Sequence, residues 1–198
     1  MIDYSDCRIM VVTKNRSIDL IQKSIDCGQR LFGENKVQEA SIKFLDLRKE
    51  YNDLDIHLIG PLQTNKVKLA LETFDTIQSI DREKLVREII KKRNGLEKTK
   101  NYFIQVNIGE EPQKSGINPE DLQNFYEYCI GNKVNIVGLM CIPPNELLPD
   151  QFFQSMIDLR NTVNEKLLLS MGMSGDYLTA LKLGSNLIRI GSAFFSDD

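Results

Sequence analysis

Residues 169–195 read LSMGMSGDYLTALKLGSNLIRIGSAFF and contain two short apolar runs, each of which stops at small residues. The first run stops at a segment rich in Ser and Gly over residues 170–176, and the second stops at Gly191 and Ser192. Between the two runs, residues 176–183 have the pattern of a short helix. A strand, a helix and a second strand in this order form a βαβ unit, whose two strands are parallel. The stretch therefore predicts part of a parallel sheet.

The same alternation extends over the rest of the chain. Eight β-type runs lie at residues 8–13, 31–33, 55–60, 76–80, 102–108, 134–140, 167–170 and 187–191. A helical pattern separates each run from the next, which predicts an α/β protein with a parallel sheet. A doubly wound sheet and a closed barrel both satisfy this order, and the count of eight favours a (β/α)8 TIM barrel. No linker, low-complexity stretch or long-period repeat divides the chain, so we expect a single domain over residues 1–198.

One helix is missing from this count. Eight strands need eight covering helices, but the pattern gives only seven, and the first run begins almost at the start of the chain. We therefore expect that the barrel lacks helical cover between its first and last strands, unless a partner or the chain tails cover it. Exposed apolar surface there would support this expectation, and a full eighth helix would contradict it.

Composition excludes several functional classes. The chain has 198 residues, 41% hydrophobic and 27% charged, with a net charge of −3, so no basic field indicates nucleic-acid binding. No apolar run is long enough to span a membrane. The cysteines have no CxxC or other ligand-like spacing, which disfavours a zinc site. Free thiols fit a reducing cytoplasm, where we expect the protein to reside. The four cysteines are Cys7, Cys27, Cys129 and Cys141.

The two small-residue segments of the opening stretch predict a phosphate site. In this barrel class, function resides at the C-terminal ends of the strands, and a phosphate commonly binds after strands seven and eight. Ser170 stands at the predicted end of strand seven, Ser174 precedes the next helix, and Gly191 and Ser192 follow strand eight. Glycine lets an anion approach the backbone, and serine adds a hydroxyl donor. The alternative is a pair of tight turns that simply need small residues.

Two cations belong to the same predicted rim. Arg189 lies two residues before Gly191 and therefore on the same side of its strand, where it needs an anion, another acceptor or a neighbouring carboxylate. Lys14 directly follows the first strand, and a desolvated rim lysine is a nucleophile, although most rim lysines are simply solvated. With a phosphate site opposite, a phosphorylated aldehyde held as a Schiff base is the natural ligand. His57, the single histidine, lies early in strand three and is interpreted as structural.

Several motifs give the chain a resemblance to a known family. They are VTK at 12–14, FGENKVQE at 32–39, HLIGPLQTNK at 57–66, QSIDR at 78–82, VN at 106–107, KSG at 114–116, GLM at 138–140 and the stretch 169–195. Together they resemble the pyridoxal phosphate homeostasis proteins of the YggS type, in order and from about residue 8 to 195. The resemblance implies a barrel similar to the N-terminal domain of alanine racemase, with pyridoxal 5′-phosphate (PLP) bound.

The resemblance also implies roles for individual residues. Lys14 matches the Schiff-base lysine of the family, and Arg189 matches an arginine that faces the pyridine nitrogen. The residues that match the phosphate cradle are Ser170, Ser174, Gly191 and Ser192. Three others end strands two, four and six and are expected to line the cofactor: Asn35, Ser79 and Met140. The sequence departs from the family at Asn186, where relatives usually have a threonine, at its C-terminal residues, and in lacking the family helix before strand one.

The resemblance implies that the protein holds PLP and buffers or delivers it, with PLP-dependent apo-enzymes as recipients, as a monomer or weak homodimer. An arginine cannot keep the ring nitrogen protonated, so broad carbanion chemistry is disfavoured. Alanine racemase also uses a tyrosine from a separate C-terminal domain, which we do not expect in this chain. Two other readings stay open: a racemase-like or aminotransferase-like enzyme of low activity, with Lys14 as base, and a phosphate-binding barrel enzyme without this cofactor.

Overall fold

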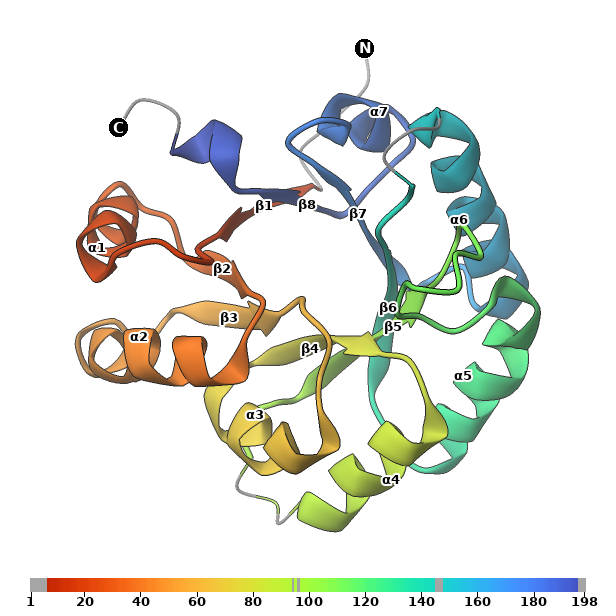
Figure 1. Ribbon diagram of the computed structural model, residues 1–198, viewed down its shortest axis with the longest axis horizontal. Coiled ribbons are helices and arrows are strands. Elements are labelled where there is room, and N and C mark those ends of the chain that lie inside the picture. The colour runs from red at the N-terminus through yellow and green to blue at the C-terminus, as the bar shows by residue number, and fades with distance from the viewer. Residues whose placement is uncertain (1–6, 94, 96, 145–147, 196–198) are drawn as a thin grey trace.

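The computed structural model describes residues 7–93, 95, 97–144 and 148–195, and its eight parallel strands close into a barrel in the order β1 to β8 (Figure 1). The strands are β1 Arg8–Val12, β2 Leu31–Glu34, β3 Asp55–Leu58, β4 Thr76–Ile80, β5 Asn101–Val106, β6 Ile136–Cys141, β7 Leu168–Met173 and β8 Leu187–Ile190. Each strand pairs with the next along the chain, and β8 pairs with β1. The predicted TIM barrel is confirmed.

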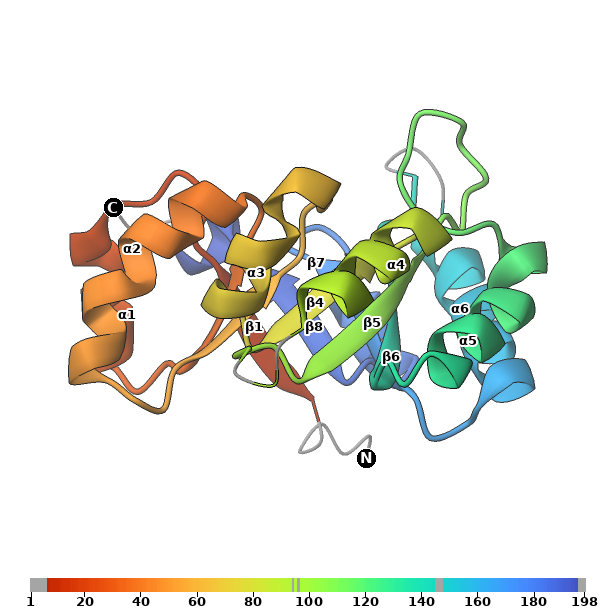
Figure 2. The ribbon, with the colours of Figure 1, turned by 90° about the horizontal axis from the view of Figure 1, so that it is seen from below.

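Helices alternate with the strands and lie outside the barrel (Figures 1 and 2). They are α1 Ile18–Asp26, α2 Val37–Glu50, α3 Val67–Thr73, α4 Glu83–Lys92, α5 Leu122–Gly131, α6 Pro149–Val163 and α7 Tyr177–Lys182, with short 3-10 turns η1 Thr64–Lys66, η2 Pro119–Asp121 and η3 Ser192–Phe194. The Ser17 side chain caps α1 by accepting from the Leu20 N–H, as a serine at this position predicts. None of the described helices is long and apolar enough to cross a membrane.

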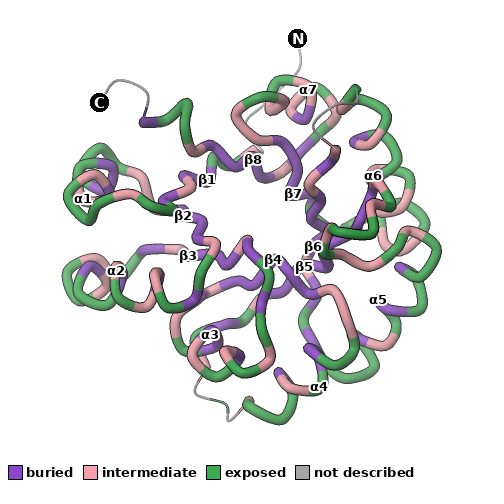
Figure 3. The backbone as a smooth tube through the Cα atoms, in the orientation of Figure 1, coloured by how far each residue is buried: buried purple, intermediate pink, exposed green. Residues whose placement is uncertain are grey.

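The strands bury side chains on both faces, as Figure 3 shows by the buried colour along the barrel wall. Outward residues pack against the helices in the larger apolar cluster. Inward residues form a second, smaller cluster inside the barrel, made of Met10, Leu31, Phe103, Met140 and Leu187. The strands therefore consist of nearly continuous apolar runs, as expected for a parallel sheet covered on both sides.

Strand β7 is longer than the sequence predicted. It continues to Met173 and pairs with Arg189 of β8 after a register shift, so the predicted strand end at Ser170 was wrong. The extension passes through Gly172, which has φ +96°, and a Cβ atom there would lie 2.5 Å from Ala180 Cβ. The backbone and packing of β7 thus require glycine at position 172, so a ligand is not the sole reason for the small residues of this segment.

The outer side of β1 and β8 is the least covered part of the barrel. In the described ranges no α-helix precedes β1 or follows β8, where only η3 is found. Ile9 on β1 is 52% exposed and Phe194 on η3 is 41% exposed, which is the apolar surface expected there. Residues 1–6, where a helix before strand one would lie, are outside the described residues.

Candidate functional site

A cavity of about 690 Å³ opens at the C-terminal ends of the strands. Six of the nine residues predicted from sequence line this cavity: Lys14, Asn35, Ser174, Arg189, Gly191 and Ser192. The other polar and glycine residues of the lining are Arg16, Gly60, Gln105, Lys114, Ser115 and Gly175, and the apolar ones are Val12, Ile59, Pro61, Ile142 and Met173. The cavity lies where a barrel of this class places its function.

The cavity is cationic. Lys14, Arg16, Lys114 and Arg189 all line it, whereas none of the lining residues found in the described chain is an aspartate or glutamate. Clefts lined by one sign of charge concentrate ligands of the opposite sign. The lining therefore favours an anionic small molecule, although the chain as a whole carries a net charge of −3.

Lys14 stands on a turn, and hydrogen bonds hold the residues on either side of it, Thr13 and Asn15. The Thr13 hydroxyl donates to Glu34 Oε1 at 2.7 Å, and the Asn15 backbone N–H donates to Glu39 Oε1 at 2.8 Å. Asn15 has φ 58°, a left-handed conformation that asparagine tolerates. Lys14 itself is exposed, and its amine has no hydrogen-bond or ion-pair partner within the described part of the chain. The turn thus presents an amine that is free to react.

A partly buried ionic cluster beneath the turn provides this support. Lys43 Nζ of α2 donates to Glu34 Oε1 at 3.0 Å, to Glu39 Oε1 at 2.5 Å and to the Thr13 carbonyl at 2.7 Å. The Glu34 side chain is fully buried, and this burial raises the pKa of its carboxyl. The hydrogen bonds from Thr13 and Lys43 lower the pKa, but the effect of burial is larger. Burial also disfavours ionisation of Glu39, but the bonds from Lys43 and Asn15 outweigh it and lower its pKa.

Arg189 is held differently. It is 3% exposed, and its Nη1 donates to the Ser170 carbonyl at 2.7 Å and to Ser170 Oγ at 2.9 Å, while Nη2 donates to the Cys141 carbonyl at 2.7 Å. Among the described residues no carboxylate pairs with it, so its acceptors are neutral. Burial lowers the pKa of Arg189. Its Nε–H and one Nη2–H have no acceptor among the described residues, and the residue lines the cavity.

Two glycines of the lining leave room in the cavity. A Cβ atom at Gly175 would meet nothing within 4 Å, and one at Gly191 would make only ordinary contacts with Val12. Neither residue has the positive φ that favours glycine. The fold does not require glycine at these positions, which leaves close approach of a ligand as a reason for it.

Three predicted residues lie away from the cavity wall. Met140 is fully buried in the apolar cluster inside the barrel, and Ser79 is buried in β4 with a hydroxyl that finds no hydrogen-bond partner among the described residues. Ser170 lies within β7, where it bonds to Arg189 and to Gln78. Asn186 precedes β8 at the opposite end of the barrel and bonds to the Leu169 backbone, so its difference from the family does not fall at the cavity.

Sequence reasoning missed two cations of the lining. The Arg16 guanidinium lies 4.8 Å from the centre of the Phe195 ring. Lys114 belongs to the long polar loop after β5, visible above the strand ends in Figure 2, where it pairs with Glu111 and donates to the Pro143 carbonyl at 3.2 Å. The KSG motif at 114–116 was part of the family resemblance, and its place in a loop at a strand end was the signal that could have assigned it to the site.

These features define the class of protein: a parallel (β/α)8 barrel with a cationic cavity at its strand ends and, after the first strand, a lysine whose amine has no partner in the described ranges. The pyridoxal phosphate homeostasis protein of Haemophilus influenzae is 36% identical over 199 residues, which cover 95% of this chain and 84% of that protein. The one of Schizosaccharomyces pombe is 35% identical over 198 residues, with 94% and 82% covered. The chain therefore belongs to the family of pyridoxal phosphate homeostasis proteins, as the motifs indicated.

Solved structures agree with this assignment. PipY of Synechococcus elongatus, solved without PLP, is 33% identical with a TM-score of 0.87, and the match covers 96% of this chain and 93% of that chain. The structure of PipY with PLP bound gives a TM-score of 0.85 at 32% identity. Alanine racemase from Corynebacterium glutamicum, at 14% identity and a TM-score of 0.75 over 56% of its length, shares the fold. No family profile matches the chain.

Proposed function

We propose that this protein binds pyridoxal 5′-phosphate in the cavity and acts in its homeostasis, by holding the cofactor and passing it on. The observation that carries the proposal is the unpartnered Lys14 amine facing a cavity lined by cations and by no acidic residue of the described chain. Membership of the family and the PLP-bound structure of the similar PipY support it.

The residues present fit the chemistry of this cofactor. Lys14 would hold the cofactor through its aldehyde group, as a primary amine beside the cavity can. Arg189 would face the ring nitrogen as a hydrogen-bond donor, which does not supply a proton to it. Ser174, Ser192 and the backbone at the two open glycines supply donors for a phosphate group. Asn35 lies beside them on the wall, and Ser170 contributes through Arg189.

We propose binding and delivery rather than robust turnover. A ring nitrogen that faces an arginine, without a carboxylate, makes the ring a weak electron sink. The lining residues include no tyrosine, histidine or carboxylate that could act as a second base within the described ranges. PLP-dependent apo-enzymes, which need the cofactor in bound form, are the recipients that we propose.

A second candidate is a racemase-like enzyme of low activity. Lys14 and Lys114 both line the cavity, so two amines are available as proton acceptors on a bound amino acid. Of the two candidates we favour the carrier, because Lys114 already pairs with Glu111 and donates to Pro143.

A spectral titration tests the proposal. The purified protein is mixed with PLP, and a visible imine band that saturates at one equivalent is the expected result. A protein that stays colourless with excess PLP would contradict it and favour a different phosphate-binding barrel. Loaded protein is then incubated with a PLP-dependent apo-enzyme, whose activity should return. Incubation with L-alanine and chiral analysis of the product decides between carrier and racemase.

Two further properties belong to the proposal. The four free cysteines of the chain fit a reducing compartment, and we propose the cytoplasm as its location. We also propose a monomer or weak homodimer. Light scattering across a range of protein concentrations measures the assembly directly, and a stable higher oligomer would contradict this.

A further inference from the structure

The interior of this barrel contains a chain of polar side chains. Barrels of this class fill their interior mainly with branched apolar residues. Here His57 and Gln78 are buried inside, 4% and 0% exposed, and Ser170 and Arg189 are buried with them. Buried polar groups are costly unless each one finds a hydrogen-bond partner. The arrangement therefore needs a reason beyond packing.

These polar side chains form one continuous series of hydrogen bonds that runs from Arg189 to Asp55. Arg189 Nη1 donates to Ser170 Oγ at 2.9 Å, and Ser170 Oγ donates to Gln78 Oε1 at 2.7 Å. Gln78 Nε2 lies 2.8 Å from His57 Nδ1, and His57 Nε2 lies 2.9 Å from Asp55 Oδ1. We call these five residues the core relay.

The two ends fix where each proton lies. Arg189 can only donate, so Ser170 accepts from it and must give its single proton to Gln78 Oε1. The Gln78 amide then presents its N–H to His57 Nδ1, which places the histidine proton on Nε2, toward Asp55. The Asp55 carboxylate can only accept, and Arg8 pairs with its other oxygen at 2.9 Å. One proton arrangement satisfies every member.

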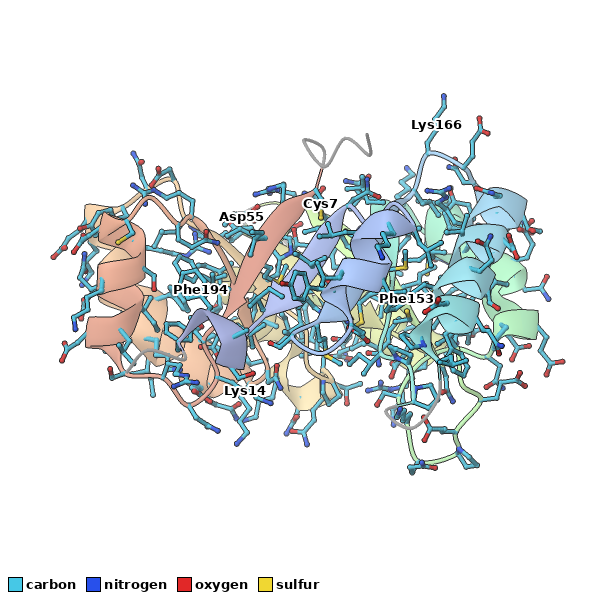
Figure 4. All side chains as sticks on the ribbon, turned by 90° about the horizontal axis from the view of Figure 1, so that it is seen from above. Cys7, Lys14, Asp55, Phe153, Lys166 and Phe194 are labelled. Atoms are coloured by element: carbon cyan, nitrogen blue, oxygen red, sulfur yellow. The ribbon has the colours of Figure 1, made fainter. Side chains whose placement is uncertain are left out.

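The core relay also crosses the barrel. Gln78 lies on β4 and Ser170 on β7, two strands that are not neighbours in the sheet. Asp55 lies at the barrel end opposite Lys14, as Figure 4 shows, whereas Arg189 lines the cavity. The relay therefore links the cavity to the far end of the barrel. With the Cys141 carbonyl on Nη2, it leaves the guanidinium a single orientation.

We propose that Gln78 and His57 are positioning residues for the cofactor, which set the orientation of Arg189 toward the ring nitrogen although neither lines the cavity. The inference rests on the proposed function. Removing Gln78 leaves the Ser170 hydroxyl free to rotate, so the side-chain acceptor of Arg189 is no longer fixed, while the Ser170 and Cys141 carbonyls still accept from it. With two fixed acceptors in place of three, we expect the Arg189 guanidinium to sample more than one orientation.

The first test needs no cofactor. Protein labelled with ¹⁵N-arginine is compared with its Gln78→Met variant by NMR, and the Arg189 signals are assigned from an Arg189→Lys sample. We expect resolved Nη–H signals in the unchanged protein and merged, exchange-averaged signals in Gln78→Met. Ser170→Ala, a smaller change that cuts the same link, provides the measurement if Gln78→Met does not fold. Resolved Arg189 signals in a folded variant would overturn the inference.

Thr99→Val is the matched control for lost stability. Thr99 is 2% exposed and donates to the Phe74 carbonyl at 2.7 Å, outside the core relay. This variant also loses a buried hydrogen bond, so it shows what destabilisation alone does to the Arg189 signals. We expect none of the merging seen in Gln78→Met. Equal merging in both variants would reduce the core relay to a structural feature and overturn the inference.

The second test uses PLP labelled with ¹⁵N at the ring nitrogen. In Gln78→Met the ring-nitrogen signal should move toward that of a free, unprotonated pyridine, and PLP should bind about three- to tenfold more weakly. An unmoved ring-nitrogen signal with merged Arg189 signals would overturn the positioning role. A failure of the unchanged protein to bind labelled PLP would instead overturn the proposed function, so the two failures are distinguishable.

Discussion

Lys14 and Arg189 line the same cavity, but the protein supports them in different ways. Lys14 is exposed on a turn, and a partly buried ionic cluster of Glu34, Glu39 and Lys43 holds its two neighbours in the chain. Arg189 is buried inside the barrel, and neutral groups hold the guanidinium itself. A nucleophile must stay free to form and break a bond, so its support acts on the backbone. A hydrogen-bond donor benefits from a fixed orientation, so its support acts on the side chain.

The largest effect is expected from Lys14→Ala. The variant should lose the imine band completely while its melting temperature stays close to that of the unchanged protein, because an exposed amine without partners contributes little to stability. Absorption spectra with added PLP and circular dichroism melts give both readouts. Lys91→Ala, an exposed lysine on α4, is the control and should keep the band. Unfolding of Lys14→Ala would show that Lys14 has a structural role.

Lys43→Met breaks the support of the Lys14 turn. It leaves Glu34 buried without its cation, which should lower the free energy of unfolding by about 3 kcal/mol and slow imine formation. Chemical denaturation and stopped-flow absorbance measure the two effects. Lys49→Met on the same helix removes an exposed pair with Asp46 and should cost less than about 0.5 kcal/mol. Equal losses in both variants would contradict the role of the partly buried ionic cluster.

The Arg189 side of the cavity is probed by replacing the two serines of the proposed phosphate site. The double variant Ser174→Ala, Ser192→Ala should weaken PLP binding roughly tenfold or more, since each lost hydrogen bond contributes about 1 kcal/mol. Pyridoxal, which lacks the phosphate, should bind both proteins alike. Ser155→Ala on α6, whose hydroxyl bonds only to the Gln151 carbonyl, is the control. An equal loss for PLP and pyridoxal would place these serines away from the phosphate.

The smallest effect concerns the far end of the core relay. Burial opposes ionisation of Asp55, but His57 and Arg8 outweigh it and lower the pKa of its carboxyl from 3.8 to about 2. A lowered pKa adds stability above pH 4 that is lost as the pH falls toward 2. Partial exposure screens this contribution to about 1 kcal/mol. Denaturation at several pH values should therefore show a shallower acid loss in Asp55→Asn, and parallel curves would contradict the shift.

The sequence predicted the fold because its signal is local. Each strand is a short apolar run, and counting eight such runs between helical patterns needs no knowledge of long-range contacts. The predicted ends of strands three and five lie two residues beyond the observed ends, and the largest error is at Ser170, where small residues stand but the strand continues to Met173. The sequence pattern does not distinguish a glycine that ends a strand from one such as Gly172, at which the strand continues with a positive φ.

The site could be predicted in part for the same reason. Lys14, Asn35 and Ser174 lie within two residues of strand ends, and position in the chain is enough to place them at the rim. Lys114 lies far along a loop, and its approach to the cavity depends on how that loop folds back. The link of Gln78 to Ser170 depends on closure of the barrel across 92 residues. His57 is buried with both ring nitrogens bonded, as expected for a satisfied histidine, but its link to Arg189 through Gln78 and Ser170 could not be predicted from its sequence position.

The central claim is that Lys14 holds the aldehyde of PLP, and peptide mapping tests it most directly. The loaded protein is reduced with borohydride, digested and analysed by mass spectrometry for the fixed cofactor. We expect one modified residue, Lys14, at close to one equivalent. Modification of Lys114 alone, or label scattered over surface lysines, would contradict it.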